Sequence, residues 1–247
     1  MLFVSSFKRN FKNLFFRLRA HRVLAPVKGS LLKLHYLILQ SEWIQKHKAS
    51  GGHLASGRLN DFYSRGYRFG KMFELFDFVS ESELKGKAID YFEFGVFKGN
   101  SIAWWLENRK EPASNFYGFD TFNGLPEDFG EFKKGDLNAG NALPVIEDKR
   151  CRFYKGLFQQ TLPGFLKTYN SRNMRVLHID CDLYSSTLFV LASMAPFLSK
   201  GDLLIFDEFV TPTQEFKAFA DFASAWYLKY ELLGAVNNYH QTAIKIC

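Results

Sequence analysis

The segment Asp90-Tyr-Phe-Glu-Phe-Gly-Val-Phe-Lys-Gly-Asn-Ser101 decides the fold of this chain. An apolar run of strand length passes through Gly95 and Gly99 into a stretch with helical patterning that starts near Ser101. Glycine permits a tight turn and a close approach of the backbone to a ligand, and the first turn of a helix offers unpaired N–H groups. The turn is therefore compatible with ligand binding, although a purely structural turn would look the same.

Short apolar runs alternate with helical patterns from residue 88 onward. We expect strands over 88–94, 115–119, 151–155, 175–179, 203–206, 230–236 and 243–247, and helices near 101–109, 162–169, 186–198 and 213–228. This alternation predicts an α/β fold with a parallel sheet and crossover helices on both faces. The last two strands are joined too tightly for a crossover helix, so we expect them to form an antiparallel pair at one edge.

The N-terminal part of the chain is basic. Residues 1–41 hold eight Lys or Arg and no acid, which leaves 32 − 8 = 24 basic against 25 acidic residues in the rest. The net charge of +7 therefore belongs to this arm, and we expect no nucleic-acid partner for the main domain. Apolar residues at helical spacing in the arm are Phe7, Phe11, Leu14, Phe15 and Leu18.

Such a stripe predicts a basic amphipathic helix. It is compatible with peripheral contact to an anionic membrane or with anchoring a partner, and also with packing on the same chain or on a second subunit of the homo-oligomer that we expect. The glycine-rich stretch 51–57 predicts a hinge, which divides the chain into an arm (1–57) and a main domain (58–247). Helical patterning over 59–79 predicts an N-terminal helical cap on that domain.

The cellular location follows from what the sequence does not contain. No apolar run approaches the ~20 residues of a membrane span, and we see no secretory signal. Cys151, Cys181 and Cys247 are scattered and form no disulfide or zinc framework. We therefore expect a cytoplasmic protein, either free or held peripherally at a membrane by its arm.

The glycine turn lacks the features of a phosphate-binding loop. The spacing G-x-G-x-x-G and the Gly-Lys-Ser/Thr pattern are both absent, and Glu93 would repel a pyrophosphate. Asp120 ends the next strand, where a carboxylate can accept hydrogen bonds from both ribose hydroxyls, although a helix N-cap is an equally good reading. Together these features suggest a nucleoside ligand with no phosphate at the turn.

Four carboxylates follow two adjacent strands: Asp180, Asp182, Asp207 and Glu208. They would repel one another unless they are protonated or share a cation, and oxygen ligands favour magnesium, calcium or manganese over zinc. One or two of them could instead cap the following helices. His178 precedes the cluster and is expected to be a core histidine, and the long loop 122–145 is expected to cover the site.

Taken together, these motifs resemble those of the class I S-adenosylmethionine-dependent methyltransferases, in particular the metal-dependent macrocin/mycinamicin O-methyltransferase family. The matching strings are Glu-Phe-Gly-Val-Phe-Lys-Gly-Asn-Ser (93–101), Gly-Phe-Asp-Thr-Phe-Asn-Gly-Leu-Pro-Glu (118–127), Lys-Gly-Leu-Phe-Gln-Gln-Thr-Leu-Pro (155–163), Ile-Asp-Cys-Asp-Leu-Tyr-Ser-Ser-Thr (179–187) and Phe-Asp-Glu-Phe (206–209). They recur in family order across roughly 90–209 and do not cover 1–57. The resemblance implies a Rossmann-like fold with a seven-stranded, mostly parallel sheet, one antiparallel edge strand and N-terminal helices.

The resemblance implies S-adenosylmethionine as the cofactor. The implied cofactor-binding residues are Glu93, Gly95, Val96, Phe97, Gly99, Ser101, Asp120, Thr121, Phe158, Gln159 and Asp180. By family pattern the glycine turn surrounds the methionine part, with Ser101 placed for its carboxylate. Asp120 would hold the ribose, and Phe158 and Gln159 would lie near the adenine ring.

The resemblance also implies a magnesium ion, or another divalent cation, held by Asp180, Asp207 and Glu208. Glu208 is one methylene longer than the Asp or Asn of most relatives. For the catalytic base the family pattern favours Asp182, with Tyr184 as a further candidate. The lysine of catechol-type enzymes is replaced by Leu183. The loop histidine proposed as the base in some sugar-modifying relatives has no counterpart between Phe122 and Cys151.

These features lead to one functional expectation and two alternatives. We expect metal-dependent methyl transfer to a hydroxyl of a small molecule or glycoside. An amine acceptor is less consistent with the carboxylate cluster, and the Asn/Asp-Pro-Pro-Tyr motif of amino-methylating enzymes is absent. The alternative from another class is a methyltransferase-like binding or scaffold module that docks a membrane or partner through its arm.

Overall fold

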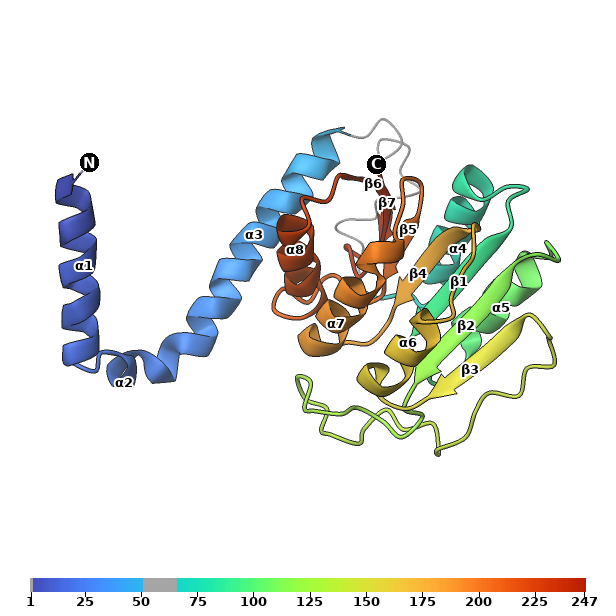
Figure 1. The fold of residues 1–247 in the computed structure, drawn as a ribbon, viewed down its shortest axis with the longest axis horizontal. Coiled ribbons are helices and arrows are strands. Elements are labelled where there is room, and N and C mark those ends of the chain that lie inside the picture. Colours follow the sequence, from blue (N-terminus) through green and yellow to red (C-terminus); the bar gives the residue numbers. More distant parts are fainter. Residues whose placement is uncertain (1, 51–65) are drawn as a thin grey trace.

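A seven-stranded sheet forms the centre of the computed structural model, which describes residues 2–50 and 66–247 (Figure 1). The strands are β1 (Ile89–Phe94), β2 (Asn115–Asp120), β3 (Cys151–Lys155), β4 (Met174–Ile179), β5 (Leu203–Phe206), β6 (Tyr230–Val236) and β7 (Gln241–Ile246). Their order is β3-β2-β1-β4-β5-β7-β6; β1 to β5 pair in parallel, and β7 is antiparallel to β5 and β6. The predicted fold class is confirmed, with the antiparallel hairpin at the edge beyond β5.

Burial on both faces explains why the central strands read as unbroken apolar runs. Every residue of β1 is buried, as is every residue of β5. Side chains alternate between faces, so Tyr91 joins one core and Phe92 the other. The parallel register of β1 and β4, with Phe94 opposite Ile179, brings their carboxyl ends to one edge of the sheet.

Helices cover both faces of the sheet (Figure 1). The core on one side contains residues of α4 (Gly70–Glu83) and α5 (Asn100–Asn108). The core on the other side contains residues of α6 (Phe158–Leu166), α7 (Tyr184–Met194) and α8 (Glu215–Ala225). A short 3-10 helix, η3 (Ala195–Phe197), continues α7.

The N-terminal region consists of α1 (Leu2–Arg17), α2 (His21–Leu24), the 3-10 helix η1 (Ala25–Val27) and the long helix α3 (Lys28–Ser50). The later part of α3 packs on the domain: Gln40 Nε2 donates to the Phe209 carbonyl at 2.6 Å, and Trp43 Nε1 donates to the Tyr230 hydroxyl at 2.8 Å. The start of α3 and all of α1 project away from the domain (Figure 1). The predicted hinge at 51–57 lies outside the described residues.

The predicted helix over 59–79 is only partly correct. Its first residues lie outside the described chain, and residues 66–69 are not helical, so the helix begins at Gly70. Gly66 has a φ of 79°, and the Asn237 side chain accepts from the Arg68 N–H and donates to the Arg68 carbonyl. These side-chain bonds hold the segment against the β6–β7 turn and compete with helix formation.

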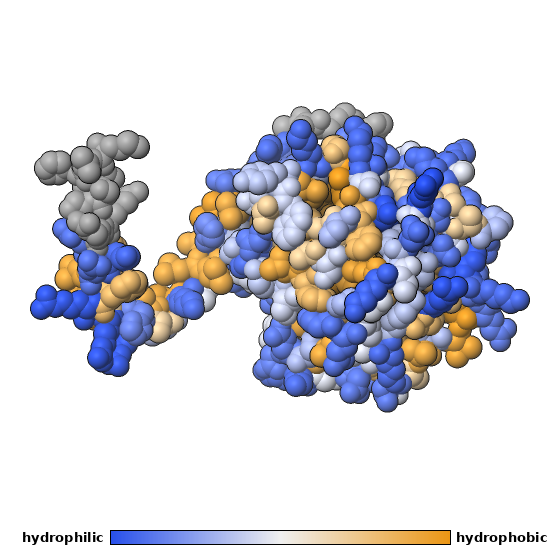
Figure 2. Space-filling model, in the orientation of Figure 1, coloured by the Kyte–Doolittle hydropathy of each residue, from blue (hydrophilic) through white to orange (hydrophobic). Residues whose placement is uncertain are grey.

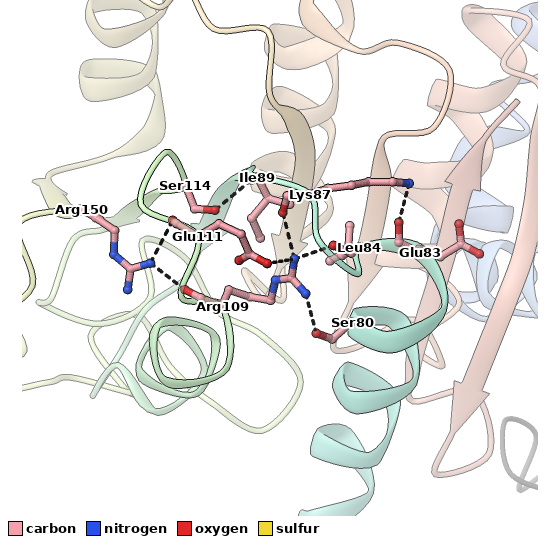
Figure 3. A network of polar contacts seen from close by, with 9 residues as sticks. All are labelled: Ser80, Glu83, Leu84, Lys87, Ile89, Arg109, Glu111, Ser114 and Arg150. Carbon is pink, nitrogen blue, oxygen red and sulfur yellow. Dashed lines mark hydrogen bonds and ion pairs between the residues drawn. The ribbon is translucent and has the colours of Figure 1, made fainter.

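A buried arginine organises the edge of the sheet at which β1 and β2 begin (Figure 3). Arg109 follows α5 and is 5% exposed. Its guanidinium donates to the Leu84 and Lys87 carbonyls at 2.5 and 2.9 Å, to Ser80 Oγ at 3.2 Å and to Glu111 Oε1 at 2.7 Å. One cation therefore joins the end of α4, the connection to β1 and the end of α5.

Candidate active site

The turn after β1 requires glycine at position 95. Gly95 has a φ of 97°, and a Cβ atom built there would overlap the backbone carbonyl of Asp180. Its N–H donates to the Phe119 carbonyl at 2.9 Å. Gly95 therefore allows the ends of β1, β2 and β4 to meet without a side chain between them.

Asp120 organises this turn as well as facing the cavity described below. Its Oδ2 accepts the N–H groups of Val96 at 2.8 Å and Phe97 at 2.7 Å, and its Oδ1 accepts the N–H of Phe122 at 2.6 Å. A carboxylate has about four lone-pair positions. The Thr121 hydroxyl also lies 3.5 Å from Oδ1, but it donates at the shorter distance of 2.9 Å to the Gly124 carbonyl. A position therefore remains for a ribose hydroxyl.

A cavity of about 320 Å³ lies at the carboxyl ends of the strands. The predicted site residues that line it are Gly95, Phe97, Asp120, Thr121, Phe158, Gln159, Asp180, Asp182 and Glu208. Apolar side chains of the loop after β2 form another part of the wall: Leu125, Pro126, Phe129, Phe132 and Leu137. The long loop thus covers the site, as expected, and the cavity is of the size and mixed polarity typical of small-molecule sites.

The other predicted cofactor residues do not belong to this lining. Val96 is 4% and Ser101 7% exposed, and Gly99 turns the chain into α5 with a φ of 79°. Glu93 is buried beneath the turn, where the Tyr91 hydroxyl donates to its Oε2 at 2.7 Å. Burial raises the pKa of Glu93 above its ordinary value.

His178 completes the buried group under the turn. Its Nδ1 lies 2.9 Å from the Tyr91 hydroxyl and 3.8 Å from Glu93 Oε2, and it is fully buried on β4. The histidine is therefore part of the core beneath the cavity, as expected.

The carboxylates after β4 and β5 form a cluster of like charge. Burial, together with repulsion from Asp207 and Asp182, raises the pKa of Asp180 well above its ordinary value. Burial and the neighbouring Asp207 likewise raise the pKa of Asp182 to about 7 and that of Glu208 to about 8. None of the ion pairs in the described chain brings a lysine or arginine to these side chains.

An uncompensated, all-oxygen cluster has the chemistry of a site for a hard divalent cation. The side chains are spread around the crevice in this structure: Asp207 Oδ1 accepts from Gln241 Nε2 at 2.9 Å, and Glu208 Oε2 lies 3.4 Å from His240 Nδ1. Across residues 2–50 and 66–247, no three His, Cys, Asp or Glu side chains converge as a ligand set. The donor types fit a cation, and binding one would require these side chains to turn toward it.

The two candidate bases occupy different environments. Asp182 lines the cavity, with a φ of 58° that holds it in the left-handed region. Tyr184 starts α7 outside the cavity lining, and its hydroxyl donates to Asp221 Oδ2 at 3.1 Å. The Lys217 ammonium lies 3.7 Å from the Tyr184 ring centroid and pairs with Asp221. Tyr184 thus packs between α7 and α8.

Three further residues border the cluster that sequence reasoning did not select. Glu215, at the start of α8, is fully buried; its Oε2 accepts the Glu208 N–H at 2.9 Å and its Oε1 has no hydrogen-bond partner. Tyr67 lies against His240, with ring centroids 4.9 Å apart. Burial and the Asp207 charge raise the pKa of Tyr67 to about 12, and burial lowers the pKa of His240.

No local pattern could have identified these residues. An acidic residue in the first turn of a helix, such as Glu215, is ordinarily explained by the helix dipole. Tyr67 and His240 lie far apart in the sequence, and only the position of the β6–β7 turn brings them together.

Comparison with known proteins gives a family match across most of the main domain. Residues 66–238 match the model of the macrocin O-methyltransferase (TylF) family. A curated relative, the 8-demethyl-8-(2,3-dimethoxy-alpha-L-rhamnosyl)-tetracenomycin-C 4′-O-methyltransferase of Streptomyces olivaceus, is 28% identical over 141 residues. The match covers 49% of this chain and 52% of the relative, so the chain spans about half the length of that protein.

Solved structures with the same fold include two methyltransferases. The calicheamicin methyltransferase CalS11 has a TM-score of 0.55 at 19% identity, over 87% of this chain and 91% of that one. The O-methyltransferase NovP has a TM-score of 0.55 at 20% identity, over 71% and 78% of the two chains. At these identities the structural similarity shows only the fold, and the family match over 66–238 shows family membership. The chain belongs to the macrocin O-methyltransferase (TylF) family.

Proposed function

We propose that this protein transfers the methyl group of S-adenosylmethionine to a hydroxyl of a sugar or of a glycosylated natural product. One observation carries the proposal. A single cavity is bounded on one side by the glycine turn, Asp120 and Gln159, and on another by the carboxylates Asp180 and Asp182. A nucleoside-type cofactor and a hydroxyl that needs deprotonation would thus be held next to each other.

The cofactor half of the site rests on Asp120 and on the start of α6. The remaining lone-pair position on Asp120 would accept a ribose hydroxyl, while Phe158 and Gln159 would border the adenine ring. The fully buried Glu93 would act from beneath the turn, on the backbone that surrounds the methionine part. The family to which the chain belongs supports S-adenosylmethionine as this cofactor.

We assign a divalent cation, with magnesium as the first candidate, to Asp180, Asp207 and Glu208. When bound, such an ion would lower the pKa of an acceptor hydroxyl and orient it. The buried carboxylates would in turn gain the compensating charge that they lack. Support comes from the oxygen-only donor set and from the absence of a lysine or arginine partner among the described ion pairs of these side chains.

Asp182 is the base that we favour. Its carboxylate lines the cavity, so it can reach a hydroxyl placed there, whereas the Tyr184 hydroxyl is already bonded to Asp221. The acceptor hydroxyl would lose its proton to Asp182 as its oxygen attacks the methyl carbon. The methyl–sulfur bond breaks with its electron pair going to sulfur, which leaves S-adenosylhomocysteine and a methyl ether.

A sugar acceptor is supported by the curated relative, whose name describes methylation of a rhamnosyl group. The apolar part of the cavity wall supports an acceptor that also carries a hydrophobic portion. The scaffold alternative has no comparable support, because a scaffold would not need the carboxylates Asp120, Asp180 and Asp182 that line the cavity.

Calorimetry with S-adenosylmethionine tests the cofactor half of the proposal. We expect the full chain to bind the cofactor, and Gln159→Ala to weaken binding about tenfold through loss of contacts at the adenine end. Gln45→Ala, an exposed glutamine on α3, is the matched control and should bind like the wild type. No binding with or without magnesium would overturn the enzyme proposal and favour a scaffold.

Mass spectrometry tests the acceptor half. The protein, S-adenosylmethionine and magnesium are incubated with nucleotide-linked sugars and with glycosylated natural products, and products heavier by one methylene group are sought. Methylation of a sugar hydroxyl is the expected result. Methylation only of amines, or of no member of either panel while the cofactor binds, would contradict this acceptor class.

A further inference from the structure

The arm exposes far more apolar surface than any other part of the described chain. Residues 11–38 contain twelve large hydrophobic side chains that are at least 42% exposed: Phe11, Leu14, Phe16, Leu18, Val23, Leu24, Val27, Leu31, Leu32, Leu34, Leu37 and Ile38. Figure 2 shows hydrophobic residues along the projecting half of α3, with hydrophilic residues around its far end. An exposed apolar surface of this extent marks an interaction site.

The charge of the same segment has only one sign. Residues 1–41 hold eight basic side chains and no acidic one, and the remainder of the chain is close to neutral with 24 basic and 25 acidic residues. On α1 Phe11 and Leu14 lie on one side of the helix and Lys12 on another, while Leu18 and Arg19 directly follow its end. The surface that the arm fits must therefore be both apolar and negatively charged.

We propose that the arm binds the surface of an anionic phospholipid bilayer and holds the methyltransferase domain beside it. The apolar side chains would enter the boundary between headgroups and acyl chains, while the lysines and arginines would contact lipid phosphates. The contact is peripheral: among the described helices, none has the length and apolar character that crossing a bilayer requires.

Charge distinguishes the bilayer from a second copy of the chain as the occupant. Two arms laid together would bring sixteen like charges into one contact, eight from residues 1–41 of each copy, with no acid in either of these segments to offset them. A nucleic acid would satisfy the charge but would leave the twelve apolar side chains in water, because such partners are bound mainly through their phosphates. A bilayer with anionic headgroups satisfies both requirements.

The later half of α3 fixes the arm to the domain. Tyr36 OH donates to Asp221 Oδ1 at 3.3 Å, Gln40 is 4% exposed, and Trp43 packs on Phe209 with ring centroids 5.0 Å apart. The helix is continuous from this docked part into the exposed part. Binding of the arm would therefore hold the domain at the bilayer, without an additional anchor.

Vesicle flotation of the full chain tests the proposal. Wild type should float with vesicles of phosphatidylcholine and phosphatidylglycerol and should not float with phosphatidylcholine alone. The variant Lys12→Gln/Arg17→Gln/Arg19→Gln/Arg22→Gln should bind the anionic vesicles about a hundredfold more weakly. The variant Phe11→Ser/Leu14→Ser/Leu18→Ser keeps the charge and should also lose binding, because the apolar contact is gone.

The matched control is Lys85→Gln/Lys149→Gln/Lys167→Gln/Lys200→Gln, which removes the same charge from exposed positions of the domain and should bind like the wild type. Cofactor binding is measured on every variant and should be unchanged, which separates this test from that of the enzyme proposal. Equal weakening by the arm and domain variants would overturn the proposal. So would wild type that remains unbound, or arm variants that change only the oligomeric state in sedimentation.

Discussion

Two groups of buried charge lie at opposite edges of the same sheet, and they are built in opposite ways. Where β1 and β2 begin, Arg109 is surrounded by two carbonyls, a hydroxyl and a carboxylate (Figure 3). Where the strands end, Asp180, Asp182 and Glu208 border one crevice, and no lysine or arginine pairs with them among the described ion pairs. The first group has a cation paired with an anion and with carbonyl acceptors, although Arg109 Nε and Glu111 Oε2 have no partner of their own, and the second group has no lysine or arginine.

The difference separates a structural role from a functional one. A buried charge with its hydrogen bonds made stabilises the fold, and removing it leaves its partners buried and unpaired. Buried like charges without partners cost stability, and such costs concentrate at sites that bind or react. Substitutions at the two edges should therefore change different properties of the protein.

The largest effect on stability should come from the Arg109 edge. Arg109→Met should lower the free energy of unfolding by about 3–5 kcal/mol, because Glu111 and two carbonyls lose their buried donor. Urea unfolding at neutral pH measures the change, and Arg172→Met, at an exposed position, is the control. A variant as stable as the wild type would show that Arg109 does not stabilise this edge of the sheet.

At the opposite edge, Asp180→Ala should abolish activity and spare stability. We expect turnover to fall at least about a thousandfold, or roughly 4 kcal/mol, while S-adenosylmethionine still binds and the urea midpoint does not drop. The control is Glu147→Ala, at an exposed position outside the cavity lining. Full wild-type activity in excess chelator would refute the metal assignment, and a strongly destabilised variant would show that Asp180 is structural.

The titration of Glu215 tests how much stability the buried, unpaired carboxylates cost. Burial and the Asp182 charge raise the pKa of Glu215 in the folded protein, so the folded state holds its proton more tightly than the unfolded state. Stability therefore falls as the pH rises above the ordinary value of 4.5, and this loss is absent below it. Wild type should lose stability across this range relative to a variant that cannot ionise.

Glu215→Gln is that variant, since an amide oxygen can still accept the Glu208 N–H. At about pH 8, in chelator, we expect it to be more stable than the wild type by about 1–3 kcal/mol, with the difference vanishing near pH 4. Thermal unfolding across this pH range measures it. A stability difference that is constant with pH would contradict the prediction that ionisation of Glu215 destabilises the folded protein. A variant less stable than the wild type at high pH would contradict it as well.

The smallest effect concerns the apolar loop that covers the site. Phe132 and Leu143 are 43% and 46% exposed in the same loop, but only Phe132 lines the cavity. Phe132→Ala should raise the acceptor KM about tenfold and change stability by less than about 0.5 kcal/mol. Leu143→Ala should leave both unchanged, and an equal effect of the two substitutions would mean that the loop contributes no specific contact.

The sequence by itself was sufficient for the sheet and for much of the site. Six of the strands, β1 to β6, were predicted within a residue of their observed bounds. For the central strands the reason is that a strand buried on both faces must be continuously apolar. Gly95, Asp120, Asp180 and Asp182 could be assigned to one crevice because the carboxyl ends of parallel strands meet at one edge. That inference needs only the position of a residue at the end of its strand.

Only the tertiary structure decided where side chains point and what they contact. Glu93 lies beneath the turn because its strand position faces Tyr91 and His178, and Tyr184 is held by Asp221 from α8. Periodicity gives the face of an element that is buried but does not name the partner that covers it. For the same reason the sequence did not identify the partner of the arm. The tertiary structure shows that the later part of α3 packs on the domain and that large apolar side chains between residues 11 and 38 are exposed.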